Sequence, residues 1–169
     1  TTGFGAPEDK IGPEFTFGIT MEKRLGEPLL IIKTAWGGRS LVTDFRPPSA
    51  GKRVFSESIR KRWKEKGLDP DKEAARQNGE LEGVYYRHMI DHVRLVLKDI
   101  QRIVPDYDPK QGYELAGFVW FQGFNDYVDG SSYPEQNKPG GYDEYADLLG
   151  RAPLDDLLPL AANALEIRF

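Results

Sequence analysis

Two short motifs carry the residues whose types and spacing could do chemistry in this chain. The first, A-W-G-G-R-S-L, covers residues 35–41, and the second, V-W-F-Q-G-F-N-D, covers residues 119–126. Backbone N–H groups at a Gly-Gly turn can approach a substrate closely, because no Cβ stands in the way. With the amide of Asn125 beside them, Gly37 and Gly38 would form an oxyanion hole, a set of donors aimed at the oxygen that becomes negative during acyl transfer.

Alternatively, both motifs are turns that end strands and have no catalytic role, because such turns favour Gly and Asn in any case. Ser40 follows the glycine pair, but no sequence feature supplies it with a base, so we expect a structural hydroxyl rather than a nucleophile. His88 and His92 have the four-residue spacing of metal-binding histidines. Met89 stands where the zincin motif needs Glu, and no third ligand is identified. We therefore expect helix-edge histidines and no metal site.

Two apolar runs must position these motifs. Residues 29–35 and 115–121 are apolar without alternation, which is typical of strands buried on both faces of a parallel sheet. Because each motif directly follows one run, both would be delivered to the same edge of that sheet. The aromatic residues near the two strand ends would either stack on sugars or cover the sheet, with core positions favoured for the two tryptophans. They are Trp36, Trp120, Phe121, Phe124 and Tyr127.

Helices are predicted around these strands. The longest runs from about Glu80 to Ile103, and Pro105 lies just past its end. Its apolar stripe, at spacings of three and four residues, consists of Tyr85, Met89, Val93, Val96, Ile100 and Ile103. Shorter helices are expected over residues 13–25, 56–66 and 142–149, with a polar linker over 67–80.

Composition narrows the function classes. A length of 169 residues suits one domain, and no apolar run is long enough to span a membrane. The net charge of −4 is a poor match to a phosphate backbone, so we expect neither a nucleic-acid nor a membrane partner. The absence of cysteine excludes disulfides, thiolate zinc sites and a cysteine nucleophile. No basic, apolar leader opens the sequence, so we expect a signal peptide to be absent or already removed.

The two motifs resemble those of the SGNH hydrolase superfamily, together with I-G-P-E-F-T-F-G (11–18) before them and D-F-R-P-P-S-A-G (44–51) between them. Within it they are most similar to sialate O-acetylesterase-like and acetylxylan-esterase-like carbohydrate esterases. The resemblance implies a three-layer α/β fold, a flavodoxin-like parallel sheet flanked by helices, which is incomplete here. Residues 1–149 would form this partial domain, and residues 150–169 depart from the family pattern.

The resemblance also implies a function and a site. The function is removal of O-acetyl groups from sugars by a serine ester hydrolase that needs no cofactor, in a family whose members are often secreted or periplasmic. The implied oxyanion donors are Gly37 or Gly38 and the Asn125 amide of a G-x-N-D block. Asp126 would buttress its loop. The expected substrate-binding residues are Arg39, Gln122, Gly123, Phe124 and Asp126.

The chain departs from the family where a nucleophile and a base are expected. It contains neither the G-Q-S-N or G-D-S block nor the D-x-x-H block, so both roles are unassigned. We therefore expect a truncated or weakly active esterase acting on a small-molecule or glycan acetyl ester. The first alternative is a non-catalytic glycan-binding or degenerate domain. The second alternative, which the sequence favours less, is a metal-dependent enzyme using His88 and His92. The family's first strand, missing here, would lie between the two apolar runs, so pairing with a second copy of the chain is one expected compensation.

Overall fold

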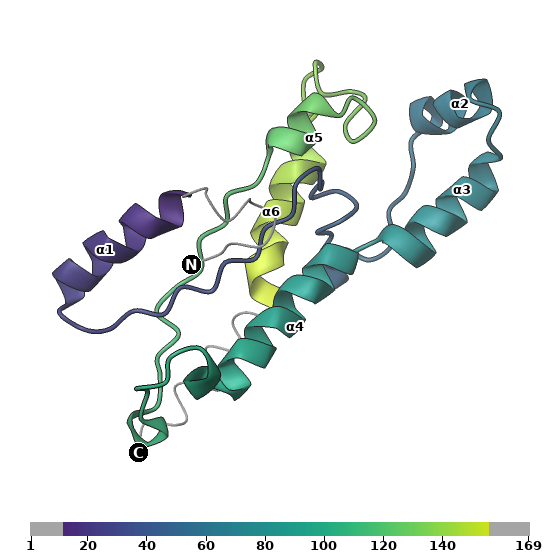
Figure 1. The fold of residues 1–169 in the computed structure, drawn as a ribbon. Helices are drawn as coiled ribbons and strands as arrows, with labels where there is room; N and C mark the ends of the chain where they lie inside the picture. The colour runs from purple at the N-terminus through teal and green to yellow at the C-terminus, as the bar shows by residue number, and fades with distance from the viewer. Residues whose placement is uncertain (1–11, 156–169) are drawn as a thin grey trace.

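The computed structural model describes residues 12–155, and this part of the chain consists of helices joined by long loops (Figure 1). No helix within it is both long and apolar enough to cross a membrane. The α-helices are α1 (Pro13–Leu25), α2 (Glu57–Glu65), α3 (Pro70–Arg76), α4 (Val84–Lys98), α5 (Phe124–Val128) and α6 (Asp143–Asp155). Short 3-10 turns cover Pro48–Ala50, Ile100–Arg102 and Pro109–Gln111, and a π-helical turn covers Gln77–Leu81.

The predicted parallel sheet is not seen between residues 12 and 155, so the expectation of a three-layer α/β, flavodoxin-like SGNH fold is wrong. Residues 29–35 and 115–121 are extended, but they form no backbone hydrogen bonds with other described residues. An apolar run favours an extended backbone, whereas a strand also needs a neighbouring backbone about 4.8 Å away. The second run is not buried on both faces either, since Val119 is 72% and Phe121 is 97% exposed.

Local start and stop signals explain the first helices. In α1, Pro13 occupies the first turn and Gly26 ends the helix in the left-handed conformation, as predicted. The predicted helix over 56–66 is also confirmed, since the Ser56 side chain caps α2 by accepting from the Ile59 N–H. The predicted linker over 67–80 is wrong. Asp69 accepts from two backbone N–H groups there, and α3 begins at the following proline.

Helix α4 lies within the predicted range but is shorter at both ends. It begins after Gly83, whose φ is 64° and whose missing Cβ would lie 2.8 Å from the Arg46 carbonyl oxygen. Its buried face includes Tyr86 and Ile90, which the predicted stripe omits, while Ile103 is exposed. The main core packs on the face of α4 that carries Tyr86 and Ile90. Periodicity shows which residues share a helix face, but it does not show which face meets the core.

The main core joins the loop after the first motif to α4 and α6. It consists of Leu41, Val42, Phe45, Tyr86, Met89, Ile90, Tyr133, Leu148 and Ala152. A second cluster of Phe55, Ile59 and Trp63, with Ala74 against it, fills the space between α2 and α3. This helix pair extends away from the start of α4 (Figure 1). The predicted helix over 142–149 is part of α6, which continues past residue 150, and residues 156–169 of the expected tail lie outside the described residues.

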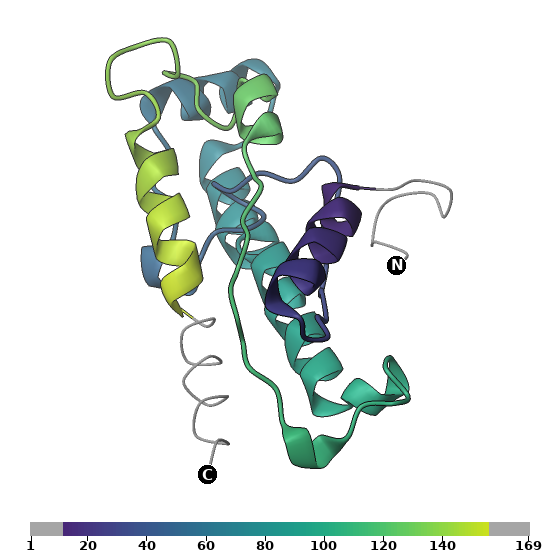
Figure 2. The same cartoon turned by 90° about the vertical axis from the view of Figure 1, so that its left-hand side faces the viewer.

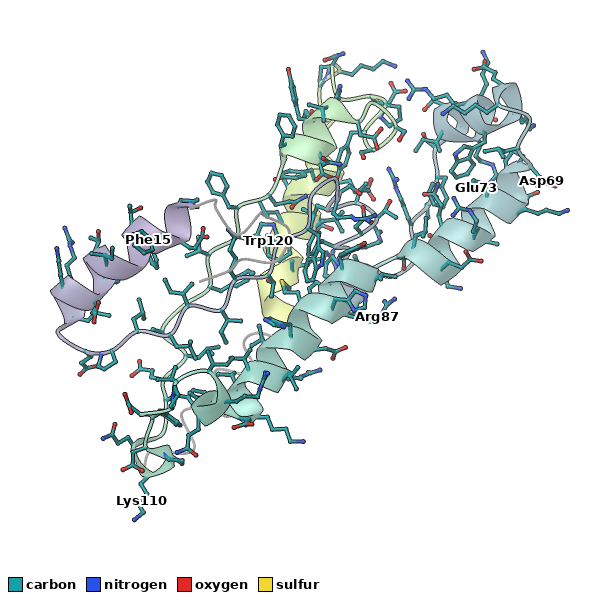
Figure 3. All side chains as sticks on the ribbon, in the orientation of Figure 1. Phe15, Asp69, Glu73, Arg87, Lys110 and Trp120 are labelled. Atoms are coloured by element: carbon teal, nitrogen blue, oxygen red, sulfur yellow. The ribbon has the colours of Figure 1, made fainter. Side chains whose placement is uncertain are left out.

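The two extended segments lead toward the same region of the molecule. Residues 27–36 approach it from α1, and residues 113–123 approach it from the far end of α4 (Figure 1). In the view of Figure 2, the second segment passes between α6 and α1 and leads directly into α5. Trp120, labelled in Figure 3, contacts Phe45 with ring centroids 5.7 Å apart. The motifs that follow the two segments are therefore neighbours in space without a sheet to align them.

Candidate functional site

The carboxylate of Asp126 joins the two motifs. Both of its oxygens accept from the backbone N–H of Leu41 at 2.9 Å, and Oδ1 also accepts from that of Val42 at 3.3 Å. The Gln122 side chain adds two further contacts, donating to Asp126 Oδ2 at 2.8 Å and to the Arg39 carbonyl oxygen at 3.0 Å. Residues 37–45 and 122–126, here called the motif junction, are thus held together by side-chain-to-backbone bonds.

Asp126 is the best-shielded acidic group of the motif junction. Its side chain is fully buried, and this burial raises the pKa of the carboxyl group above its usual range. The hydrogen bonds from Leu41, Gln122 and Val42 act in the opposite direction, because they favour the charged form. The burial of the Asp126 carboxylate suits the expected role of supporting its loop. It does not suit the expected direct contact with a substrate.

A second carboxylate, Asp44, shapes the turn of the first motif. Its Oδ2 accepts from the Ser40 backbone N–H at 2.9 Å and from the Ser40 hydroxyl at 3.2 Å, while Arg39 Nη1 lies 3.4 Å from Oδ1. The Ser40 hydroxyl also accepts from the Thr43 N–H at 3.3 Å. Ser40 is buried and its hydroxyl belongs to this turn, the arrangement expected of a structural serine.

Two of the expected oxyanion donors, the backbone N–H groups of Gly37 and Gly38, belong to an exposed turn. Gly37 and Gly38 are exposed, and no atom lies within 4 Å of where a Cβ would stand on either residue. Gly38 has a φ of 74°, which explains why glycine suits this position. Within residues 12–155, the N–H groups of this pair and the side-chain amide of Asn125 make no hydrogen bond. No residue between 12 and 155 therefore competes with an external acceptor for these donors.

Tyr145 of α6 supports the second motif, and sequence reasoning missed it. Its hydroxyl donates to the Gln122 carbonyl oxygen at 3.0 Å. Gly123, the next residue, has a φ of 141°, and a Cβ there would lie 3.1 Å from the Tyr145 hydroxyl oxygen. No motif marks Tyr145 in the sequence, because the contact depends on how α6 packs.

The aromatic residues separate into a packed group and an exposed group. Trp36 packs on Tyr85 with centroids 5.3 Å apart, and Trp120 packs on Phe45, so both tryptophans support the core. The guanidinium of Arg39, an expected substrate-binding group, lies 4.2 Å from the centre of the Tyr85 ring. The exposed group consists of Phe124, which belongs to the motif junction, and of Phe121 and Tyr127, which flank it in sequence.

The two histidines lie on α4. The His88 ring packs edge-on against Tyr85 at 5.8 Å and lies 6.4 Å from the Trp36 ring, which makes it a helix-edge contact of the packed aromatic group. His92 is half-buried. Among residues 12–155, no group of three or more His, Cys, Asp or Glu side chains could hold a metal ion. The structure therefore adds no third ligand to this pair.

Comparisons with protein-family models, with curated proteins and with solved structures give no match to this chain.

Proposed function

We propose that this protein is an esterase-type hydrolase acting on O-acetyl groups of sugars, in a weakly active form, and that the motif junction stabilises the oxyanion. The observation that carries the proposal is the Asp126 carboxylate, which binds the backbone of Leu41 and Val42 and so fixes the Gly-Gly turn near α5. Asn125 directly precedes this buried anchor. We therefore expect its amide to lie near the turn that carries Gly37 and Gly38.

Donors of this kind suit acyl transfer, because the carbonyl oxygen of an ester gains negative charge as the tetrahedral intermediate forms. A backbone N–H of the glycine pair and the Asn125 amide would then bind that oxygen more strongly in the transition state than in the substrate. Losing one such donor typically costs about 2.7–4 kcal/mol of transition-state stabilisation. Open space over both glycines supports the approach of an ester from this side.

The exposed aromatic residues support a sugar ester as the substrate. Phe124 is 78% exposed, and Tyr127 lies three residues along the same short helix, on a neighbouring position of its face. Aromatic rings offer large flat apolar surfaces, which pack against the apolar faces of sugar rings. The two rings flank Asn125 in sequence, so we expect a bound sugar to lie near this part of the motif junction.

Acetyl-ester hydrolysis by the purified chain tests the proposal. We expect slow turnover of 4-nitrophenyl acetate and of an O-acetylated sugar, with no effect of a chelator or of a serine-directed phosphonate. Oxyanion donors and binding alone leave about a 10³–10⁴-fold acceleration over water in triad enzymes that have lost their triad. Asn125→Ala should lower the rate about 10²–10³-fold. The matched control is Asn137→Ala, at an exposed loop position away from the motif junction.

Three results would contradict parts of this proposal. Unchanged turnover in Asn125→Ala, with circular dichroism like that of the parent, would remove the oxyanion assignment. Loss of turnover on chelation would favour the metal-dependent alternative through His88 and His92. Stoichiometric labelling of a serine by the phosphonate would show that an unassigned nucleophile has been assembled.

Non-catalytic glycan binding is the second candidate, because the exposed rings of Phe124 and Tyr127 suit a bound sugar whether or not it is hydrolysed. In that case an acetylated sugar would bind in calorimetry without being hydrolysed. Phe124→Ala should then weaken binding, whereas Asn125→Ala should leave it nearly unchanged. Under the esterase proposal, both substitutions reduce turnover.

A further inference from the structure

The extended segment Leu115–Phe121 has the composition of a strand, and no residue between 12 and 155 pairs with its backbone. Its sequence, L-A-G-F-V-W-F, is rich in aromatic and β-branched residues and contains neither proline nor charge. Its backbone N–H and C=O groups form no hydrogen bond with other residues of the described part of the chain. Figure 2 shows this stretch crossing the face that is turned to the viewer. An unpaired edge of this composition is a ready template for another strand.

The two faces of the segment differ. Trp120 and Phe118 form one face, with ring centroids 5.3 Å apart, and Trp120 also packs on Phe45. Val119 and Phe121 belong to the opposite face and are largely exposed, and an added Cβ at Gly117 on that face would meet no atom within 4 Å. The outer face therefore has two large apolar side chains beside an open position.

We infer that this segment pairs with the same segment of a second copy of the chain, as an antiparallel, two-fold symmetric strand pair centred on Phe118. In that register the two Phe118 side chains face each other at the centre, and each remaining large side chain faces a smaller one. Val119 would face Gly117 of the second copy, Trp120 would face Ala116, and Phe121 would face Leu115. A two-fold interface forms each of these contacts twice.

The absence of charge in the segment permits pairing with a second copy, and the arrangement of its side chains favours it. No charged residue occurs from Leu115 to Asn125, although 30% of the chain is charged and its net charge is −4. Two acidic copies repel each other over most of their surface, but they can meet at this segment without bringing like charges together. Large and small residues are also arranged in the segment so that it complements itself. This pairing does not depend on the proposed hydrolase function.

Sedimentation velocity across a range of chain concentrations tests the pairing. We expect a reversible monomer–dimer equilibrium for the parent, and at least a tenfold weaker dimer for Val119→Lys, which places a charge opposite Gly117 of the second copy. Val54→Lys is the matched control, because Val54 is 91% exposed and lies before α2, outside the segment. A parent that stays monomeric, associates into larger species, or dimerises equally well after Val119→Lys would overturn the inference.

Cross-linking tests the register in the full chain. The sequence has no cysteine, so Phe118→Cys introduces a single thiol at the centre of the proposed pair. In the antiparallel register the two thiols face each other across the two-fold axis, within the Cα separation that a disulfide needs. We expect disulfide dimers to form at least tenfold faster in Phe118→Cys than in Val54→Cys. Equal rates would contradict this register, and preferential capture of a different protein's strand would contradict the choice of partner.

Discussion

The Tyr145 hydroxyl binds the carbonyl of Gln122 and occupies the space beside Gly123 where any other residue would have its Cβ. This contact joins α6 to the turn before α5. Since Asn125 and Asp126 follow within three residues, the packing of α6 determines where the proposed donor and its anchor lie. A helix without motif residues of its own thus positions the second motif.

Gly123→Ala should destabilise the protein by about 1–3 kcal/mol, because a φ of 141° is costly for any residue with a Cβ and the methyl group would press on Tyr145. Urea unfolding followed by circular dichroism measures the change. Gly130→Ala is the matched control, since an added Cβ there meets nothing within 4 Å and its φ is not positive. Equal stability of the two variants would show that Gly123 is not constrained in this way.

Asp126→Ala should lower the free energy of unfolding by about 2–5 kcal/mol. It leaves the buried N–H groups of Leu41 and Val42 without an acceptor, and each unsatisfied buried group costs about 1–3 kcal/mol. Asp106→Ala, at an exposed loop position, should change the free energy of unfolding by less than about 0.5 kcal/mol. If both variants unfold at the same urea concentration, Asp126 does not anchor the motif junction.

The raised pKa of Asp126 predicts a specific pH dependence. Between the unfolded value of 3.8 and the higher folded value, the folded state binds more protons at this group than the unfolded state does. Asp126 alone therefore makes stability fall as pH rises through that window. Asp126→Asn removes this contribution, so the variant's free energy of unfolding should change with a more positive slope above pH 3.8 than that of the parent. Parallel curves would contradict the raised pKa.

Two buried tyrosines provide a matched pair. The Tyr133 hydroxyl is buried and has no hydrogen-bond partner among the described residues, whereas the Tyr86 hydroxyl donates to the Ala152 carbonyl at 3.1 Å. Tyr133→Phe should therefore leave the free energy of unfolding unchanged or raise it. Tyr86→Phe should lower the free energy of unfolding by about 1 kcal/mol. Calorimetry of both variants checks this difference. Destabilisation by Tyr133→Phe would mean that its hydroxyl has an acceptor in solution.

Signals encoded in neighbouring residues predicted α1 and α2, but not α3 or α5. Pro13 and Gly26 delimit α1, and Ser56 begins α2, because caps and turns depend on residues a few positions apart. The same rule could have found α3, since Asp69-Pro70 is a helix start, but the surrounding polar composition favoured a linker. The buried face of α4 was shifted toward Tyr86, because the packing partner decides it.

The predicted sheet failed for a related reason. Residues 29–35 and 115–121 have strand composition, but a ladder depends on a distant partner that composition does not supply. The prediction that the two motifs lie together did not need the sheet, since Asp126 binds Leu41 directly. Tyr145 had no recognisable pattern in the sequence, and Asp44 lay in the recognised segment 44–51 without an assigned role, although both hold the two turns in place.

The bond between Leu41 and Asp126 joins residues 85 positions apart, and the α2–α3 pair with its own apolar cluster lies inside that span. Bringing together residues so far apart in sequence costs configurational entropy. We therefore expect this contact to form late in folding. The α2–α3 pair needs only local contacts and can form earlier. We therefore expect the α2–α3 pair to assemble before the two halves of the proposed site meet.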